Sequence, residues 1–310
     1  MKILVLGGTR FVGRTVVEVL LRDHEVFVLN RTTQPLWDSR LMQLFADRND
    51  AVQMRQALGA ASYDAVVDVS GTEPVHISNV IRALPQRESL RYVYISPAAV
   101  HNQLSADPPF RRRIGLMAMR SGTATGRRKP PAKRCCVTAS PWCPDDPAPP
   151  YVYGPRNAEQ RELLPWARML SGRPVFVPGD GSTRIQFVDA RMLARIVVTA
   201  CEGRLVPDVY NVGEHTTYSF LEYLHILGHV AEVAPRLAMV TDTSVRPRDY
   251  FPFRDAELTL NVNKLAAAGV EEDSVLTKGL ADTPAWFRRH GDLTYIPTSQ
   301  EREWLTSRRR

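Results

Sequence analysis

The sequence predicts an α/β fold in which a doubly wound, parallel β-sheet carries helices on both faces. Short apolar runs alternate with helical segments along the first hundred residues. The runs are continuously apolar rather than alternating, which is typical of strands buried on both faces. A glycine cluster follows the first run immediately, where a strand would turn into a helix.

The elements follow from these periodicities in chain order. Residues 3–6 form an apolar run that ends at Gly7, and the apolar positions from Val16 to Leu21 give one wide helical face. Further strands are expected at residues 25–30, 63–70, 91–96 and 209–213, and a strand followed by a turn at residues 174–181. Further helices are expected at residues 51–58, 75–84, 163–170, 192–201 and 220–227, the last of them capped by Ser219.

The chain is expected to form two unequal domains. Residues 1–180 are expected to form the domain of the parallel sheet, and residues 181–310 mainly a smaller α/β region that binds substrate. A segment at about 105–148 interrupts the first domain, because periodicity is lost there and prolines are dense. This segment is predicted to be irregular or disordered.

The net charge of +7 is concentrated in that same segment. Nine Lys and Arg side chains and no Asp or Glu lie between Pro108 and Pro144, so the remainder of the chain is close to neutral. The four cysteines have no spacing typical of a zinc site or a disulfide framework. No apolar run approaches the ~20 residues that span a bilayer, and the N-terminus lacks the pattern of a secretory signal. A cytoplasmic location without membrane contact is therefore expected.

The glycine cluster predicts a dinucleotide site. Gly7 would permit the tight turn, Gly8 would let the main chain approach phosphate, and Gly13 would let the helix pack closely on the strand. Free N–H groups at the start of the following helix favour a bound pyrophosphate. The candidate cofactor-binding residues of this turn are Gly7, Gly8, Thr9, Arg10, Phe11, Val12 and Gly13.

The end of the second strand bears on the choice of cofactor. Asn30 and Arg31 stand where an acidic residue would bind the ribose hydroxyls of NAD and repel a 2′-phosphate. Arg31 is suited to pair with that phosphate, so NADP is predicted, with NAD as the alternative. A solvated Arg31 is the other interpretation. Asp47 and Arg48 are placed to reach the adenine rim.

With these motifs the chain resembles the extended and atypical short-chain dehydrogenase/reductase superfamily, in its NAD-dependent epimerase/dehydratase branch, over residues 1–102 and 149–290. GGTRFVG is similar to the glycine motif of the superfamily, with Arg10 in place of the usual middle glycine. YVYISPAAV resembles the strand that carries the catalytic Ser or Thr, and YVYGPRN resembles the loop that closes over nicotinamide. The resemblance implies a Rossmann fold and an NAD(P)-dependent reaction.

Two further motifs imply a sugar-nucleotide substrate. PGDGSTRIQFVDARMLA resembles the segment whose arginine holds the sugar nucleotide, here Arg184, with Gln186 beside it. VRPRDYFPFRDAEL resembles an RPxD segment with Arg246 and Asp249 in its key positions. Two guanidinium groups suit a diphosphate, and surface ion pairs are the alternative interpretation. No metal site is expected, since Glu222, His225 and His229 share a helical face without a further ligand.

The catalytic pair of the superfamily is missing from its expected position. No Tyr-x-x-x-Lys occurs between Ser96 and Tyr151, and Pro97 aligns with the usual catalytic Ser or Thr. Ser96 is the adjacent hydroxyl, although strand alternation turns it to the other side. In the resembling enzymes the lysine lowers the pKa of the tyrosine, which then transfers a proton. The displayed chain is therefore expected to be catalytically impaired.

A shifted reading frame explains the missing pair. If the codons of residues 124–136 are read one base early, the codon junctions permit Y-G-x-x-K-A-A-C-E-A-L-L, which has the spacing of a catalytic helix. A frameshift over about 105–148 would account together for the excess of Pro, Arg and Cys. A genuine insertion is the alternative.

Two functions are weighed on this basis. The first is an NAD(P)-dependent epimerase, dehydratase or reductase that acts on a sugar nucleotide. The alternative is a non-catalytic dinucleotide-binding protein that binds RNA through its basic segment, because the atypical relatives include RNA-associated members. The oligomeric state is open, with a homodimer as one expectation.

Overall fold

The computed structural model describes residues 1–33, 35, 37–85, 90–96, 134–138, 151–157, 161–270, 275–290, 294 and 296–307. Its largest element is a seven-stranded sheet in which every neighbouring pair of strands is parallel. The strand order is β10-β6-β5-β4-β1-β2-β3. The strands are β1 (Lys2–Leu6), β2 (Glu25–Asn30), β3 (Met42–Phe45), β4 (Ala65–Asp68), β5 (Arg91–Ser96), β6 (Arg134–Thr138) and β10 (Val209–Asn211).

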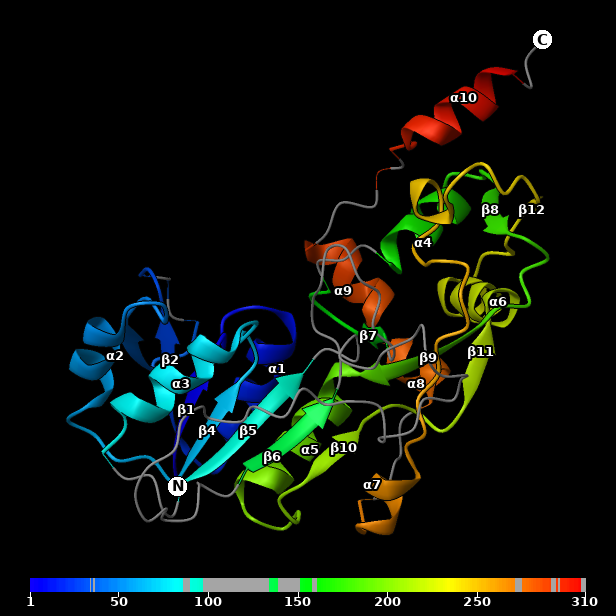
Figure 1. Ribbon diagram of the computed structural model, residues 1–310. Coiled ribbons are helices and arrows are strands. Elements are labelled where there is room, and N and C mark those ends of the chain that lie inside the picture. The colour runs from blue at the N-terminus through cyan, green and yellow to red at the C-terminus, as the bar shows by residue number, and fades with distance from the viewer. Residues whose placement is uncertain are drawn as a thin grey trace.

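Helices cover both faces of this sheet, as the sequence predicts (Figure 1). Ile3 and Val5 of β1 pack into a core with α1 (Phe11–Leu20) and α5 (Ala190–Cys201). Leu4 and Leu6 point to the other face and pack with α2 (Ala51–Leu58) and α3 (Pro74–Ala83). The period of two along β1 therefore divides its side chains between two cores. The prediction of a Rossmann-type α/β fold is confirmed.

The second part of the molecule has its own core and two small sheets. One sheet has the order β11-β9-β7, formed by β7 (Tyr151–Tyr153), β9 (Arg184–Asp189) and β11 (Thr217–Ser219), and the other pairs β8 (Val175–Pro178) with β12 (Leu237–Val240). Aromatic side chains fill the core between these strands and their helices. The helices here are α4 (Leu163–Leu170), α6 (Phe220–Ala231), α8 (Leu276–Leu280), α9 (Thr283–His290) and α10 (Ser299–Ser307).

Several sequence-based boundaries agree with the structure and others need correction. Strand β2 and helix α2 have the expected bounds, and Ser219 caps α6 through a reciprocal capping box with Glu222. The strand expected at 63–70 is confined to Ala65–Asp68. Helix α6 runs to Ala231, four residues beyond the expected end at 227.

Two larger expectations concern the middle of the chain. Within the segment at about 105–148, expected to be irregular, the structure describes only Arg134–Thr138, which form β6 between β5 and β10. The correction has a physical reason: Cys-Cys-Val-Thr includes β-branched residues, which favour a strand, and it has a parallel partner on each side. The expected boundary near residue 180 stays a prediction; α5 and β10, which follow it, belong to the large sheet and its cover.

None of the described helices is long and apolar enough to cross a bilayer.

Candidate functional site

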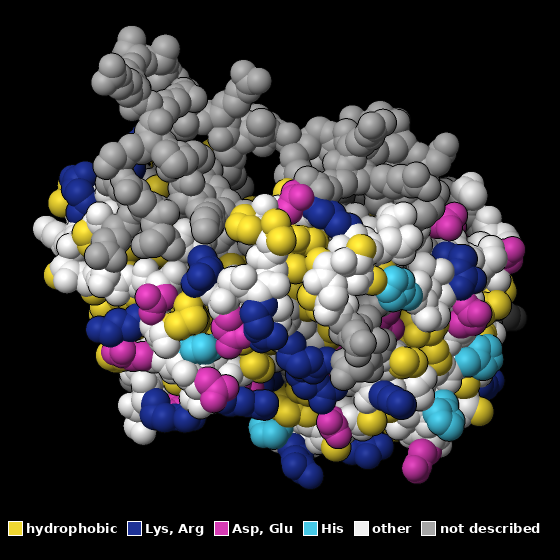
Figure 2. Space-filling model, turned by 90° about the horizontal axis from the view of Figure 1, so that it is seen from below, with side chains coloured by type: hydrophobic (Ala, Val, Ile, Leu, Met, Phe, Trp, Pro, Cys, Tyr) yellow, Lys and Arg dark blue, Asp and Glu magenta, His cyan; other side chains and the backbone are white. Residues whose placement is uncertain are grey.

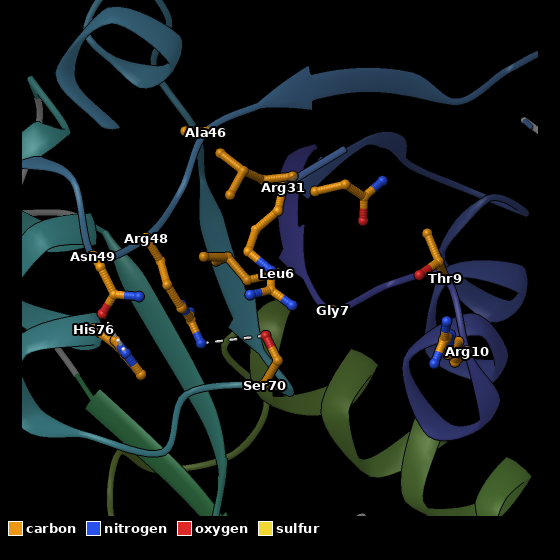
Figure 3. A pocket seen from close by; sticks show the side chains of 12 residues that line it. Leu6, Gly7, Thr9, Arg10, Arg31, Ala46, Arg48, Asn49, Ser70 and His76 are labelled. Carbon is orange, nitrogen blue, oxygen red and sulfur yellow. Dashed lines mark hydrogen bonds between the residues drawn. The ribbon is translucent and has the colours of Figure 1, made fainter. Parts of the chain in front are cut away.

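A cavity of about 460 Å³ lies where the strand order of the large sheet reverses. In parallel α/β sheets, ligands bind at such a switch point, beyond the carboxyl ends of the strands. The cavity is lined by residues that follow β1, β2, β3 and β4, which brings distant parts of the sequence together (Figure 3). The lining residues are Leu6, Gly7, Thr9, Arg10, Leu29, Asn30, Arg31, Ala46, Arg48, Asn49, Ser70 and His76.

The glycines at the β1–α1 turn have distinct roles. Gly7 has a φ of 83°, a conformation that side chains rarely adopt, and it lies against Ser70. A Cβ atom on Gly13 would overlap the main-chain oxygen of Gly7, so the helix packs closely on the turn, as the motif predicts. A Cβ atom on Gly8 would instead contact Val5, Val17 and Val28. A side chain at Gly8 would therefore point into the core and not toward the cavity. The expectation that the missing side chain of Gly8 makes room for phosphate is wrong in this respect.

The other residues of the turn divide between cavity and core. Thr9 and Arg10 line the cavity. Val12 is buried in the core, and Phe11 packs against the same core while half-buried. Neither side chain lines the cavity, although Phe11 begins helix α1 directly beside it.

The end of β2 supplies two polar groups to the cavity wall. The Nδ2 atom of Asn30 is buried and has no hydrogen-bond partner within the described parts of the chain. The exposed Arg31 side chain extends into the cavity (Figure 3). Among the residues that the structure describes, no ion pair or hydrogen bond of the Arg31 side chain is found. Both groups are available to a ligand.

Asp47 and Arg48, predicted to act together at the adenine rim, are used differently. The Asp47 carboxylate accepts hydrogen bonds from the main-chain and side-chain nitrogens of Asn49, at 2.9 and 3.1 Å, and does not line the cavity. Arg48 does line it and is bound to Asp68 at the end of β4. The Asp47 side chain therefore stabilises the turn before α2 through its hydrogen bonds to Asn49.

Three polar residues that line the cavity were not predicted from the sequence motifs: His76, Ser70 and Asn49. His76 Nδ1 accepts from the main-chain N–H groups of Thr72 and Glu73, and its Nε2 lies 3.0 Å from Asn49 Oδ1. Its side chain thus caps its own helix and faces Asn49 across the cavity wall. Ser70 Oγ accepts a hydrogen bond from Arg48 Nη1 at 3.2 Å. Asn49 follows Arg48 directly, which was the only sequence signal for it.

A second cavity, of about 790 Å³, lies in the other part of the molecule, at the ends of β8 and β12. Arg246 and Asp249 line it and form an ion pair at 3.2 Å, which leaves most of the Arg246 side chain exposed. A short 3-10 helix (Pro247–Asp249) holds these two residues on one wall. Arg248, Arg254, Asp242 and Asp255 give the same cavity a mixed charge.

The other two predicted substrate residues have partners within the protein. Arg184 on β9 donates to the side chain and the main chain of Thr217 and lies 3.4 Å from Glu222. Gln186 is 1% exposed and bonds the main chain of Glu214 and Leu260 through both ends of its amide. Neither lines the second cavity. Gln186 holds β9 to the segment beyond it, a role that its position in the motif did not reveal.

A buried acid follows the YVYGPRN loop and is bound to its last residue. Glu162, just after this loop, accepts hydrogen bonds from Asn157 Nδ2 at 2.9 and 3.3 Å. Burial raises the pKa of the Glu162 carboxyl from 4.5 to about 7, although the hydrogen bond from Asn157 acts in the opposite direction. The carboxyl therefore changes charge near neutral pH.

The catalytic side of the site lies largely outside the described residues. Ser96 is the last residue of β5, and only its main chain is described. Residues 97–133 and 139–150, which hold Pro97 and most of the proposed frameshift, lie outside the described part. Among the described residues, no group of three or more His, Cys, Asp or Glu side chains is arranged to hold a metal ion.

Comparison with known proteins gives one family match. Residues 148–213 match the family model of the NAD dependent epimerase/dehydratase family. A curated relative, the chloroplast stem-loop binding protein of 41 kDa b from Arabidopsis thaliana, is 24% identical over 334 residues, which cover 94% of this chain and 82% of the relative.

Solved structures resemble the chain along nearly its whole length. The UDP-glucose 4-epimerase of Thermus thermophilus, solved with NAD, has a TM-score of 0.64 at 19% identity and covers 94% of this chain and 100% of its own. The UDP-glucose 4-epimerase of Thermotoga maritima, solved with UDP-glucose, has a TM-score of 0.65 at 15% identity, with coverage of 94% and 100%. The dTDP-glucose 4,6-dehydratase of Bacillus anthracis, solved with NAD, has a TM-score of 0.69 at 15% identity, with coverage of 94% and 97%.

These matches agree with the motifs that predicted the resemblance. The match at residues 148–213 includes the YVYGPRN loop and the segment that carries Arg184 and Gln186. The fold alignments extend the likeness over the remainder of the chain. Residues 148–213 are therefore similar to the NAD dependent epimerase/dehydratase family, and the chain has the fold of the solved sugar-nucleotide epimerases and dehydratase.

Proposed function

We propose that the chain binds NADP, with NAD as the alternative, in the cavity beyond β1, β2 and β4, and belongs functionally with the epimerases, dehydratases and reductases of sugar nucleotides. The observation that carries this proposal is the cavity at the switch point, bordered by Gly7 in a left-handed conformation and by Arg31 extended into the space. The solved neighbours with NAD support the class of cofactor.

The residues present fit a dinucleotide. The N-terminus of α1 follows Gly7 and Thr9, so its free N–H groups face the region where a pyrophosphate is stabilised. Asn30 Nδ2 is a donor without a partner, and Arg31 is a cation without a counter-charge among the described residues. An acid at the end of β2 would disfavour a 2′-phosphate, and Asn30 and Arg31 occupy that end instead. When bound, the coenzyme supplies the hydride acceptor and donor.

The proposed substrate side is the second cavity. Arg246 and Asp249 line its wall, and Arg184 and the turn through Thr183 lie on the adjoining β9 segment. A guanidinium group that remains mostly exposed while paired to Asp249 is suited to a diphosphate. One neighbour was solved with UDP-glucose, which supports a sugar nucleotide as the substrate class.

Replacing Arg31 tests the cofactor assignment. We expect Arg31→Ser to weaken NADPH binding by about 10- to 100-fold, because one charge-assisted contact to the 2′-phosphate is lost. NADH binding is expected to change by less than about threefold, since NADH lacks that phosphate. Titration of coenzyme fluorescence measures both constants.

Arg22→Ser is the matched control. Arg22 is also an exposed arginine of the N-terminal part of the chain, but it lies outside the cavity. Equal losses for NADH and NADPH in Arg31→Ser would contradict NADP selectivity. Absence of a saturable signal with either coenzyme in the unaltered chain would overturn the dinucleotide site itself.

Catalytic impairment is the second part of the proposal. The displayed sequence has no Tyr-x-x-x-Lys between Ser96 and Tyr151, so proton transfer lacks the phenol that the resembling enzymes use. We expect coenzyme binding with little or no turnover of UDP-glucose or dTDP-glucose, measured by NADPH absorbance and product chromatography. Resequencing the gene tests the frameshift, and a product that regains the motif is expected to regain turnover.

RNA binding is a second candidate function, favoured by the name of the Arabidopsis relative. The candidate surface is the segment 105–148 with its nine cations, nearly all of which lie outside the described residues. In the described part of the face shown in Figure 2, Lys and Arg side chains are interspersed with Asp and Glu side chains and do not form a broad basic stripe. We expect any RNA affinity to fall steeply as salt rises and to vanish when residues 105–148 are deleted. Binding that survives the deletion would contradict this assignment.

A homodimer and a cytoplasmic location stay predictions.

A further inference from the structure

Strand β4 ends in an acid, Asp68, that contacts the wall of the proposed cofactor cavity through Arg48. Asp68 is fully buried and follows three buried apolar residues of the same strand. We propose that Asp68 is a positioning residue for the coenzyme, which acts by holding the Arg48 guanidinium in one orientation at the cavity wall. This inference rests on the proposed function, since it assumes that the cavity binds a pyridine dinucleotide.

The Asp68 carboxylate is saturated with donors. Arg48 Nη2 lies 2.9 Å from each of its oxygens. The Tyr92 hydroxyl donates to Oδ2 at 2.8 Å from the neighbouring strand β5. The main-chain N–H groups of Gly71 and Ser70 donate to Oδ1 at 2.9 and 3.2 Å. Because these donors come from the loop after β3, from β5 and from the loop after β4, the carboxylate has a fixed position relative to the sheet.

Burial restricts the Asp68–Arg48 ion pair to one arrangement. A buried carboxylate without a cation is strongly destabilising, so Arg48 is retained beside it. The Arg48 side chain is 11% exposed, and the group still reaches the cavity surface. A long arginine in solvent samples many rotamers, whereas this one is held before any ligand arrives. Such preorganisation lowers the entropic cost of binding.

The same pair is connected to the phosphate turn. Arg48 Nη1 donates to Ser70 Oγ at 3.2 Å, the contact drawn in Figure 3. Ser70 in turn lies against Gly7, where a Cβ atom on the glycine would come within 2.8 Å of the Ser70 side chain. The ends of β1, β3 and β4 are therefore joined through Arg48, with Asp68 as the anchor.

Arg48 and Arg31 approach the cavity from different strands. Arg31 extends from the end of β2 into the cavity, while Arg48 lies in the loop after β3 and is held by Asp68 and by Ser70, the latter contact drawn in Figure 3. A flexible cation suits a mobile phosphate, and a fixed planar guanidinium suits the flat adenosine end of the coenzyme. Asp68 thus determines whether Arg48 presents its planar group to the ligand.

Binding of NADPH to four variants tests this role. We expect Asp68→Asn to raise the Kd for NADPH about tenfold, and Arg48→Met to raise it by a similar factor. The double variant Asp68→Asn/Arg48→Met is expected to show about tenfold rather than about one hundredfold, because both changes remove one arrangement. Tyr92→Phe removes another hydrogen bond to the same carboxylate and leaves Arg48 paired, so its Kd is expected to stay within about twofold.

Thermal unfolding, followed by circular dichroism, confirms that each variant is folded at the titration temperature. The Tyr92→Phe control separates positioning from stability, since a merely structural role for Asp68 would weaken NADPH binding in both variants alike. Equal Kd values in Asp68→Asn and the unaltered chain, or losses that multiply in the double variant, would overturn the inference alone. Lack of NADPH and NADH binding by the unaltered chain would overturn the proposed function together with it.

Discussion

Replacement of Glu301 by Ala is expected to lower the free energy of unfolding by about 3–5 kcal/mol, the usual cost of leaving one partner of a buried ion pair alone. Arg168 of α4 and Glu301 of α10 are 1% and 0% exposed, and Arg168 Nε donates to Glu301 Oε1. The guanidinium also donates to the carbonyl groups of Leu164 and Tyr250, at 3.0 and 3.2 Å. Without Glu301 the buried guanidinium group of Arg168 loses its ion pair with α10.

The same substitution removes one of the two hydrogen bonds that cap α10. Glu301 Oε2 accepts from the N–H of Thr298 at 2.8 Å, and Trp304 of the same helix packs on Phe176 and Tyr250. Urea unfolding followed by tryptophan fluorescence measures the loss. Glu303→Ala is the control on the exposed side of α10, with an expected loss below about 0.5 kcal/mol. A loss below about 1 kcal/mol in Glu301→Ala would mean that the helix is not anchored by this pair.

The Glu162→Gln variant is expected to be more stable than the unaltered chain above pH 7, by up to about 3 kcal/mol. Burial raises the pKa of Glu162 from 4.5 to about 7 in the folded chain. Between these pH values the folded chain holds a proton that the unfolded chain releases, so the free energy of unfolding falls as pH rises through this window. Glutamine cannot ionise, and the variant is expected to lack that decline.

Urea unfolding at pH 5 and at pH 8 measures the difference. Near pH 5 the two proteins are expected to have similar stability, because the Glu162 carboxyl is protonated in the folded chain. Glu222→Gln is a matched control at the start of α6, where hydrogen bonds from Ser219 lower the pKa of the glutamate. That control is expected to lose stability at pH 8 instead. A uniform gain at both pH values in Glu162→Gln would refute the titration account.

The fold was predictable where one short segment carries its own signal. The run EVFVLN has four consecutive apolar residues, two of them β-branched valines, and it forms β2 with the expected bounds. Asp50 caps α2 and Ser219 caps α6, both through side-chain contacts to nearby N–H groups that local sequence can encode. Strands β7, β11 and β12 have three or four residues and depend on partners far along the chain. Their pairing is decided by tertiary contacts, which the local pattern does not contain.

The candidate site divides in the same way. Gly7, Arg31 and Arg48 were predicted because the glycine motif and the strand ends fix their place in a parallel sheet. Asp68 was missed, although an acid that ends the buried run Ala-Val-Val-Asp signals a carboxylate that needs a cation. Its partner stands 20 residues earlier in the sequence, and only the strand order β4-β1-β2-β3 brings the two together. Gln186 shows the converse, since its motif position did not reveal that its amide is used by the main chain.

The chain passes more than once between the seven-stranded sheet and the three-stranded sheet. This path affects any attempt to change substrate preference by exchanging segments with a relative. After β9 the chain returns as α5 and β10 to the large sheet, and it leaves again at β11. Val16 and Val17 of α1 share one core with Leu193 and Val197 of α5. A chimera that takes residues 181–310 from a relative would import half of that helix interface as well. Grafts limited to the loops around Arg246 would leave it intact, so they are the better route to altered specificity.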